Sequence, residues 1–293
     1  MSSRPSARLL HSADGQPLAL HDFGGSGPVL LMTHGNGLNA GMWVSVAAIL
    51  RDQFHCYGLD FRGHGAAVSL SPAGQPGLEM AVDRDRYAED LRAAVEAVGG
   101  PRILGVGHSL GGVASVYSAL RWPGLFRAMW LYEPVLVPAT FERGPFSDGL
   151  AEASRRRRQV FDSVQDAVAR FQSKPPFNVC RPEPVTAYAE IGTFQRPDGS
   201  VQLCCSGDNE ARVFASGAPQ DFSQYAAIAC PTIVACGGTA HLGETPAIVA
   251  PLVAEALGNA RLERYDDLTH FGPMEDPERM AASILAHFAP FRN

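Results

Sequence analysis

The sequence predicts an α/β protein built on a mostly parallel sheet. Continuous apolar runs such as 28–33 and 231–236 are typical of strands that helices cover on both faces. Segments with apolar residues every three or four positions, such as 84–98, alternate with these runs and predict amphipathic helices. A chain of 293 residues, 46% of them hydrophobic and 18% charged, is also long and apolar enough to bury a large core.

The N-terminal third begins with a hairpin and then turns to parallel strands. Asp14-Gly15 lies between two short strand-like segments, and this dipeptide strongly favours a β-hairpin. The Ser-, Pro- and Gly-containing stretch at 66–81 predicts a surface loop. The expected elements are, in order, strands at 7–11, 17–23 and 28–33, a helix at 42–50, a strand at 54–59 and the helix at 84–98.

The run Gly107-His108-Ser109-Leu110-Gly111 is the centre of the chain. An apolar strand leads into it and an apolar-periodic helix follows, which is the strand–turn–helix context of a nucleophile elbow. Its two glycines provide the room that so tight a turn needs. We expect Ser109 to protrude above the sheet edge, with the N–H of Leu110 directed at any negative charge that develops there. His108 is expected to point away from the nucleophile.

The alternation of strands and helices stops after a strand at 127–132 and resumes at 231–236. Between them, residues 135–222 contain a helical stretch at 150–171, the breaker Lys174-Pro175-Pro176 and an irregular segment. The elements expected after it are a helix at 246–257, a strand at 260–265 and a closing helix at 277–289.

Four motifs occur in an order that resembles the α/β-hydrolase family over nearly the whole chain. They are Thr33-His34-Gly35-Asn36-Gly37, Asp60-Phe61-Arg62-Gly63-His64-Gly65, the run around Ser109, and Leu268-Thr269-His270-Phe271-Gly272-Pro273. The resemblance implies a mostly parallel eight-stranded sheet with helices on both faces. It also implies a core domain formed by 1–134 and 223–293, with a mainly helical cap inserted at 135–222.

The resemblance also places the groups that would act with Ser109. A serine hydroxyl is a weak nucleophile and needs a base within hydrogen-bond reach. His270 stands where the family's base falls, and the N–H of Asn36 is implied as the second oxyanion donor beside that of Leu110. His34 is expected to make a structural hydrogen bond that holds its loop.

The acid that orients His270 is where the sequence departs from the family's common pattern. The usual acid follows the strand that ends at Cys236, but the next five residues, 237–241, offer no carboxylate. Glu244 is the only acid in that loop. A second arrangement in the family takes the acid from the strand after the nucleophile helix, where Glu133 stands. We favour Glu133 and keep Glu244 as the alternative.

These residues predict a serine hydrolase that cleaves a small to medium carboxylic ester or lactone through an acyl-enzyme on Ser109. One alternative is a carbon–carbon bond hydrolase acting on a diketone. An alternative of another class is a non-catalytic ligand-binding protein on the same scaffold. A haloalkane dehalogenase or an epoxide hydrolase would need an aspartate at position 109. No metal or cofactor is expected, because no His, Cys or acid spacing suggests a metal site.

Composition limits the partners and the compartment. The net charge of −6 and the pI near 5.8 argue against nucleic acid, so a small-molecule substrate is the expected partner, with a homodimer possible. No apolar run is long enough to span a membrane, and Met1 to Pro5 lack a signal peptide's apolar region. Six cysteines without zinc-type spacing fit a reducing compartment. We therefore expect a cytoplasmic protein.

One basic cluster, Arg155-Arg156-Arg157-Arg158, interrupts the acidic composition. The simplest interpretation is a solvated helix face. A patch for an acidic substrate or an anionic surface is the alternative interpretation.

Overall fold

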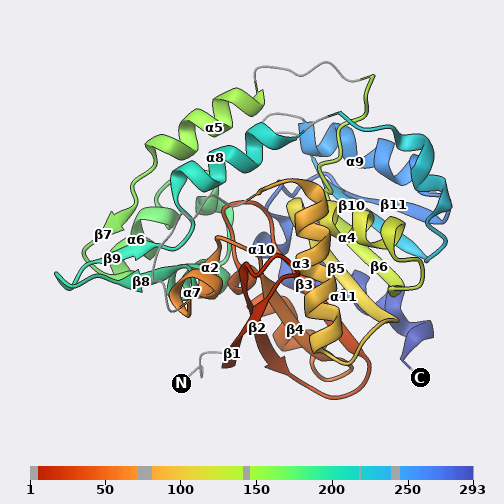
Figure 1. Ribbon diagram of the computed structural model, residues 1–293, viewed down its shortest axis with the longest axis horizontal. Coiled ribbons are helices and arrows are strands. Elements are labelled where there is room, and N and C mark those ends of the chain that lie inside the picture. Colours follow the sequence, from red (N-terminus) through yellow and green to blue (C-terminus); the bar gives the residue numbers. More distant parts are fainter. Residues whose placement is uncertain (1–5, 72–80, 141–145, 218, 239–244, 293) are drawn as a thin grey trace.

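A computed structural model of the chain describes residues 6–71, 81–140, 146–217, 219–238 and 245–292, with no side chains described at 146–148. Its centre is an eight-stranded sheet (Figure 1). The strands lie in the order β1 (Ser6–His11), β2 (Pro17–Gly24), β4 (His55–Asp60), β3 (Val29–Thr33), β5 (Ile103–His108), β6 (Phe126–Tyr132), β10 (Thr232–Gly237) and β11 (Ala260–Tyr265). Only the pairs β1–β2 and β2–β4 are antiparallel, which confirms the mostly parallel sheet.

Helices cover both faces of this sheet. The helices of the core are α1 (Val44–Leu50), α3 (Arg84–Ala97), α4 (Leu110–Arg121), α9 (Thr245–Ala256), α10 (Gly272–Glu275) and α11 (Pro277–Phe288). Neighbouring residues of β3 point to opposite faces: Leu31 packs with α3 and α4, whereas Leu30 and Met32 pack with α1 and α11. Both faces are therefore buried, as the continuous apolar runs predict.

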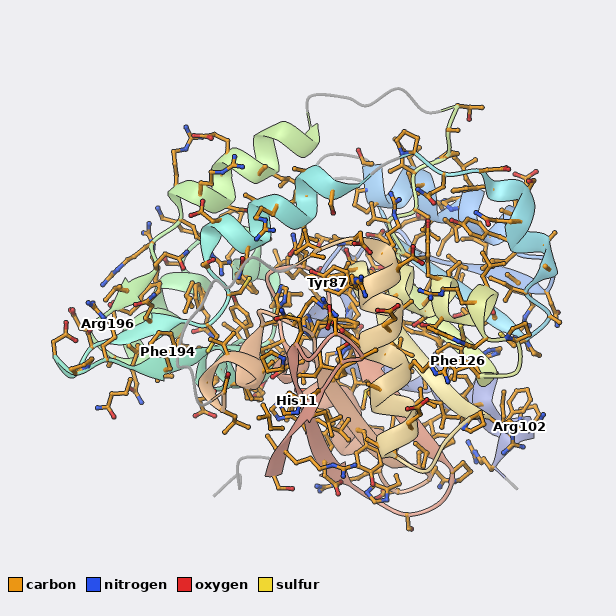
Figure 2. All side chains as sticks on the ribbon, in the orientation of Figure 1. His11, Tyr87, Arg102, Phe126, Phe194 and Arg196 are labelled. Carbon is orange, nitrogen blue, oxygen red and sulfur yellow. The ribbon has the colours of Figure 1, made fainter. Side chains whose placement is uncertain are left out.

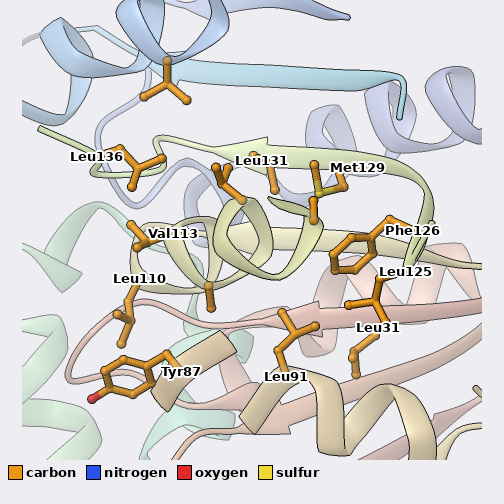
Figure 3. Close-up of a cluster of buried hydrophobic side chains, with 14 of the residues drawn as sticks. Leu31, Tyr87, Leu91, Leu110, Val113, Leu125, Phe126, Met129, Leu131 and Leu136 are labelled. Carbon is orange, nitrogen blue, oxygen red and sulfur yellow. The ribbon is translucent and has the colours of Figure 1, made fainter. Parts of the chain in front are cut away.

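The face that α3, α4 and α9 cover holds the larger apolar cluster. Figure 3 shows part of it, with Leu91 of α3 on the side of Leu31 of β3 and Val113 of α4 between Leu110 and Leu136. The apolar positions of α3 recur at helical spacing, so its buried residues form one stripe against the sheet. This packing fixes α4, and with it the turn that carries Ser109.

Most of the segment between β6 and β10, from residue 146 to 216, gathers on one side of the molecule (Figure 1). Its helices are α5 (Phe146–Arg156), α6 (Val164–Gln172), α7 (Pro182–Ile191) and α8 (Gly207–Ser216), and its small sheet has the order β7 (Val160–Phe161), β9 (Val201–Leu203) and β8 (Thr193–Gln195). We call this segment the cap. Its boundaries at residues 135 and 222 stay a prediction.

The prediction of a single helical stretch at 150–171 is wrong. The chain leaves the helix after Arg156, and Val160–Phe161 pair with β9 before α6 begins. Phe161 is buried against Val201 and Leu203, so tertiary packing overrides the local helical pattern. The segment expected to be irregular also contains α7 and α8.

The stretch expected as a loop at 66–81 starts with a short helix, α2 (Gly65–Ser69). The carboxylate of Asp60 accepts a hydrogen bond from the N–H of Ala66 at 2.7 Å, which satisfies a donor at the start of this helix. The described residues also contain short 3-10 helices at Ala40–Trp43, Phe177–Val179, Phe222–Ala227 and Ala289–Phe291. Among the described helices, none combines the length and the apolar character of a membrane span.

Candidate active site

Ser109 lies in the tight turn between β5 and α4. Its backbone angles are φ 52° and ψ −112°, a conformation that side-chain-bearing residues rarely adopt. A Cβ on Gly111 would lie 2.5 Å from Oγ1 of Thr33, and one on Gly107 would lie 2.8 Å from the backbone N of Gly112. Both glycines are thus required by close approach of helix and strand, as the sequence predicts for a nucleophile elbow.

His270 and Glu133 form a hydrogen-bonded pair beyond the ends of β11 and β6, the two strands that flank β10. Nδ1 of His270 lies 2.5 Å from Oε2 of Glu133. The other carboxylate oxygen, Oε1, accepts the N–H of Gly237 at 2.8 Å, and the Glu133 side chain is only 1% exposed. Because the carboxylate accepts from Nδ1–H, it fixes the tautomer that leaves Nε2 free to act as a base.

The loop that carries His270 is held in place by β6 and α10. The hydroxyl of Tyr132 donates to the carbonyl of Thr269 at 2.7 Å. The N–H of Thr269 donates to Oε1 of Glu275 at 3.0 Å. These bonds restrain the residue next to His270, so the ring keeps its orientation toward Glu133. Glu244, the alternative acid, lies outside the described residues.

The loop after β3 contains Asn36 and faces the elbow. The N–H of Gly111 donates to the carbonyl of His34 at 3.0 Å, which joins the loop to the first turn of α4. A Cβ on Gly35 would lie 3.2 Å from Cβ of Ser109, so the loop backbone passes directly beside the nucleophile candidate. Asn36 and Leu110 line the same cavity as Ser109, where their N–H groups are the candidate oxyanion donors.

Buried histidines hold this loop from behind. Nε2 of His34 accepts the N–H of Phe61, and Nε2 of His64 accepts the N–H of Gly37, both at 3.1 Å. Burial, together with repulsion from His34, lowers the pKa of His64 to about 3. Burial also lowers the pKa of His34, and both rings accept an N–H at Nε2 as neutral imidazoles. The structural hydrogen bond expected for His34 is present.

The turn at Asp60 and Arg62 braces the core. Asp60 is buried and accepts hydrogen bonds from His21 and from the N–H of Ala40. Burial acts to raise the pKa of Asp60, but attraction and hydrogen bonding from His21, together with His34 and the N–H of Ala40, hold the pKa below its usual value. Arg62 is equally buried and pairs with Asp90 at 2.5 Å. Neither residue lines the cavity that contains Ser109.

His108 is not placed as the sequence analysis expects. Its ring lies 4.6 Å from the ring of His270, and its Nε2–H donates to the carbonyl of His270 at 2.8 Å. Burial, reinforced by repulsion from His270, lowers its pKa well below the ordinary value. His108 is thus a neutral ring in the wall of the site that fixes the His270 backbone. Its place next to Ser109 was the only sequence signal for this contact.

A cavity of about 630 Å³ lies between the elbow and the cap. Ser109, His270 and Asn36 are in its wall, together with Phe161 and Phe171 of the cap. Figure 2 shows Tyr87, another wall residue, near the centre of the molecule, whereas Phe194 lies toward the tip of the cap sheet. A cavity of this volume, with a mostly apolar wall and a few polar groups, suits a small-molecule ligand.

The basic cluster is not simply a solvated helix face. Only Arg155 and Arg156 lie on α5, which ends there. Arg157 is largely buried and pairs with Glu210 of α8, its Nη1 lying 2.9 Å from Oε2. Arg156, Arg157 and Arg158 all line the cavity.

The sequence model of the alpha/beta hydrolase family matches residues 29–283 of this chain. The chain is an α/β hydrolase. The α/β hydrolase is 26% identical over 226 residues to the 2-(acetamidomethylene)succinate hydrolase of Mesorhizobium japonicum, which covers 76% of this chain and 75% of that protein. It is 28% identical over 163 residues to a bifunctional esterase/perhydrolase of Acinetobacter calcoaceticus, which covers 55% of this chain and 54% of that protein.

The fold of this α/β hydrolase also occurs among solved structures. The crystal structure of E-2-(acetamidomethylene)succinate hydrolase superposes with a TM-score of 0.78 at 20% identity, covering 97% of this chain and 99% of that one. Within the described residues, no group of three or more His, Cys, Asp or Glu side chains is arranged to hold a metal ion. All six cysteines are free.

Proposed function

We propose that this α/β hydrolase is a serine hydrolase that cleaves a small to medium carboxylic ester or lactone through an acyl-enzyme on Ser109. One observation carries the proposal: a serine on a strained elbow shares a cavity wall with a histidine that is hydrogen-bonded to a buried carboxylate. The esterase among its relatives supports the reaction class.

The proposed mechanism follows from the geometry of the triad. Nε2 of His270 takes the proton from Oγ of Ser109 as the oxygen attacks the carbonyl carbon, and Glu133 stabilises the imidazolium that forms. The N–H groups of Leu110 and Asn36 bind the oxyanion. His270 then protonates the leaving group, and water, activated by the same ring, hydrolyses the acyl-enzyme.

Replacing the nucleophile candidate tests the proposal. We expect Ser109→Ala to lower kcat on an ester or lactone at least about 10⁴-fold, because the nucleophile is lost while the fold is kept. The measurement is turnover of a panel of acyl esters, lactones and a vinylogous diketone, with circular dichroism as the check on folding.

A fluorophosphonate probe separates the alternatives. Labelling of the wild type but not of Ser109→Ala, with turnover of esters or lactones, supports the proposal. Turnover of the diketone alone would favour the carbon–carbon hydrolase. If no substrate of the panel is turned over and the probe does not label the protein, a ligand-binding protein is favoured.

A further inference from the structure

The wall of the cavity has a charge opposite to that of the chain. The protein carries 30 acidic and 24 basic residues. Among the described residues that line the cavity, six are cationic and one, Glu210, is acidic. The cations are Arg84, Arg156, Arg157, Arg158, Arg170 and Lys174. Like charges collected around an apolar cleft raise the local concentration of an oppositely charged ligand.

The single carboxylate is already neutralised inside the protein. Glu210 pairs with Arg157, whose Nη2 also donates to the carbonyl of Cys205 at 3.3 Å. The backbone carbonyl of Glu210 accepts a hydrogen bond from Nδ2 of Asn36 at 2.9 Å, and this bond holds α8 against the loop beside Ser109. The Arg157–Glu210 pair is therefore structural. Because its two charges are opposite, the pair adds almost no net charge to the cavity wall.

Four of the other cations, Arg156, Arg158, Arg170 and Lys174, keep their charge available to a ligand. Arg156 and Arg158 pair with Glu152 and Asp166, but these pairs are solvent-exposed and weak. Arg170 and Lys174 are exposed, and neither has a side-chain hydrogen bond or ion pair with any residue in the described part of the chain.

An aromatic wall leads from these two cations to the triad. Arg170 precedes Phe171, whose ring lies 5.4 Å from that of Phe177. The ring of Phe177 lies 5.3 Å from that of Phe271, the neighbour of His270. All three phenylalanines line the cavity. A ligand along this wall thus has an apolar middle, with its reacting group at Ser109 and its far end at Arg170 and Lys174.

Building on the serine-hydrolase function proposed above, we propose that the substrate is an ester or lactone whose acyl part ends in an anionic group, a carboxylate or a phosphate. The anionic end lies against Arg170 and Lys174, and the apolar chain between it and the carbonyl lies on the aromatic wall. The cap thereby selects acidic substrates.

The test compares 4-nitrophenyl esters that differ only at the far end of the acyl chain. Chains of about six to ten carbons end in a carboxylate, a phosphate or the neutral methyl ester, lengths suited to a cavity of this class. We expect kcat/KM of at least one of the two anionic series, the carboxylates or the phosphates, to exceed that of the neutral series at least about tenfold at low salt. The preference falls as NaCl is added, because the two cations are exposed.

Variants assign the preference to the proposed residues. We expect Arg170→Gln with Lys174→Gln to reduce the ratio of anionic to neutral kcat/KM by about fivefold or more, mainly through KM. The matched control is Arg155→Gln, which removes a cation of the same cap that does not line the cavity. It should leave the ratio unchanged. Equal ratios in the wild type and the double variant would overturn the proposal.

A binding measurement keeps this test separate from that of the reaction. In Ser109→Ala the esters are not hydrolysed, so calorimetry gives their dissociation constants directly. The anion site is supported if an anionic ester binds more tightly than the neutral ester and this difference is lost when Arg170→Gln and Lys174→Gln are added. This result holds even if no ester is turned over. Ser109-dependent turnover without any charge preference in rate or binding rejects the anion site and leaves the serine-hydrolase proposal standing.

Discussion

At the scale of single residues, two of the candidate triad members have strained backbones. Ser109 has φ 52° and Glu133 has φ 44°, and Arg102 is the one other described non-glycine residue with positive φ. Such conformations cost about 1–3 kcal/mol each and persist where surrounding structure enforces them. Here the N–H of Ser109 donates to the carbonyl of Tyr132, and that of Glu133 to Ala235, so each is tied to the next strand of the sheet.

The acid assignment gives a prediction at this scale. We expect Glu133→Gln to lower kcat about 10²- to 10⁴-fold, because an amide no longer enforces the His270 tautomer or stabilises its cation. Glu244→Gln should change kcat by about twofold or less, as for a residue that takes no part in catalysis. Steady-state kinetics of the two variants decides between the two acids, and the reverse ranking would contradict our assignment.

At the scale of elements, the site depends on how closely α4 approaches β3. Gly111 lies in the first turn of α4, and a Cβ there would come within 2.6 Å of the carbonyl carbon and oxygen of Thr33. The same turn is hydrogen-bonded to His34, the start of the loop with the second oxyanion candidate. Separation of helix and strand would therefore displace nucleophile and oxyanion donors together.

This close contact predicts the effect of one added methyl group. We expect Gly111→Ala to lower the free energy of unfolding by about 1–3 kcal/mol, because rigid backbone must shift to accept the Cβ. Urea denaturation measures the change. Gly149→Ala in α5, where a Cβ meets nothing within 4 Å, is the control and should be neutral or slightly stabilising. Similar losses in both variants would argue against the steric cause.

At the scale of the whole molecule, the site rests on buried polar groups that join separate parts of the sheet. His64, beneath the loop of Gly37, is buried in its neutral form, with its pKa lowered from 6.5 to about 3 by burial and then by His34. The native state therefore binds fewer protons than the unfolded state between these values. Its contribution to stability is complete above the unfolded pKa of 6.5 and is lost as the pH falls toward 3.

The pH dependence of unfolding tests this contribution. Between about pH 6 and pH 4, we expect the unfolding free energy of His64→Gln to fall less steeply than that of the wild type, by about 1.4 kcal/mol per pH unit. The glutamine keeps an acceptor for the N–H of Gly37. His11→Gln, at an exposed position of β1, serves as the control. Parallel slopes for the wild type and His64→Gln would show that His64 is protonated in the native state as well as in the unfolded chain over this range, and would contradict the lowered pKa.

The sheet and the turn that carries Ser109 could be predicted because they depend on local signals, whereas His270 and Glu133 were assigned through the resemblance to the α/β-hydrolase family. Apolar runs mark strands that are buried on both faces, and the turn chemistry around Ser109 is specific. The cap was predicted less well. Phe161 forms a strand only because β9 lies beside it, and the position of Arg157 in the cavity depends on Glu210 in another helix. Such pairings are not encoded within a local window of sequence.

The distance along the chain between the triad partners has a consequence for biogenesis. His270 and Glu133 are 137 positions apart, so their hydrogen bond closes a very long loop. Contacts of this kind form late, because the entropy of ordering the intervening chain opposes them. In a nascent chain whose β11 is still inside the ribosome, His270, which follows β11, cannot yet reach Glu133. Recovery of turnover after dilution from denaturant would accordingly mark the last stage of folding, after the recovery of helical signal.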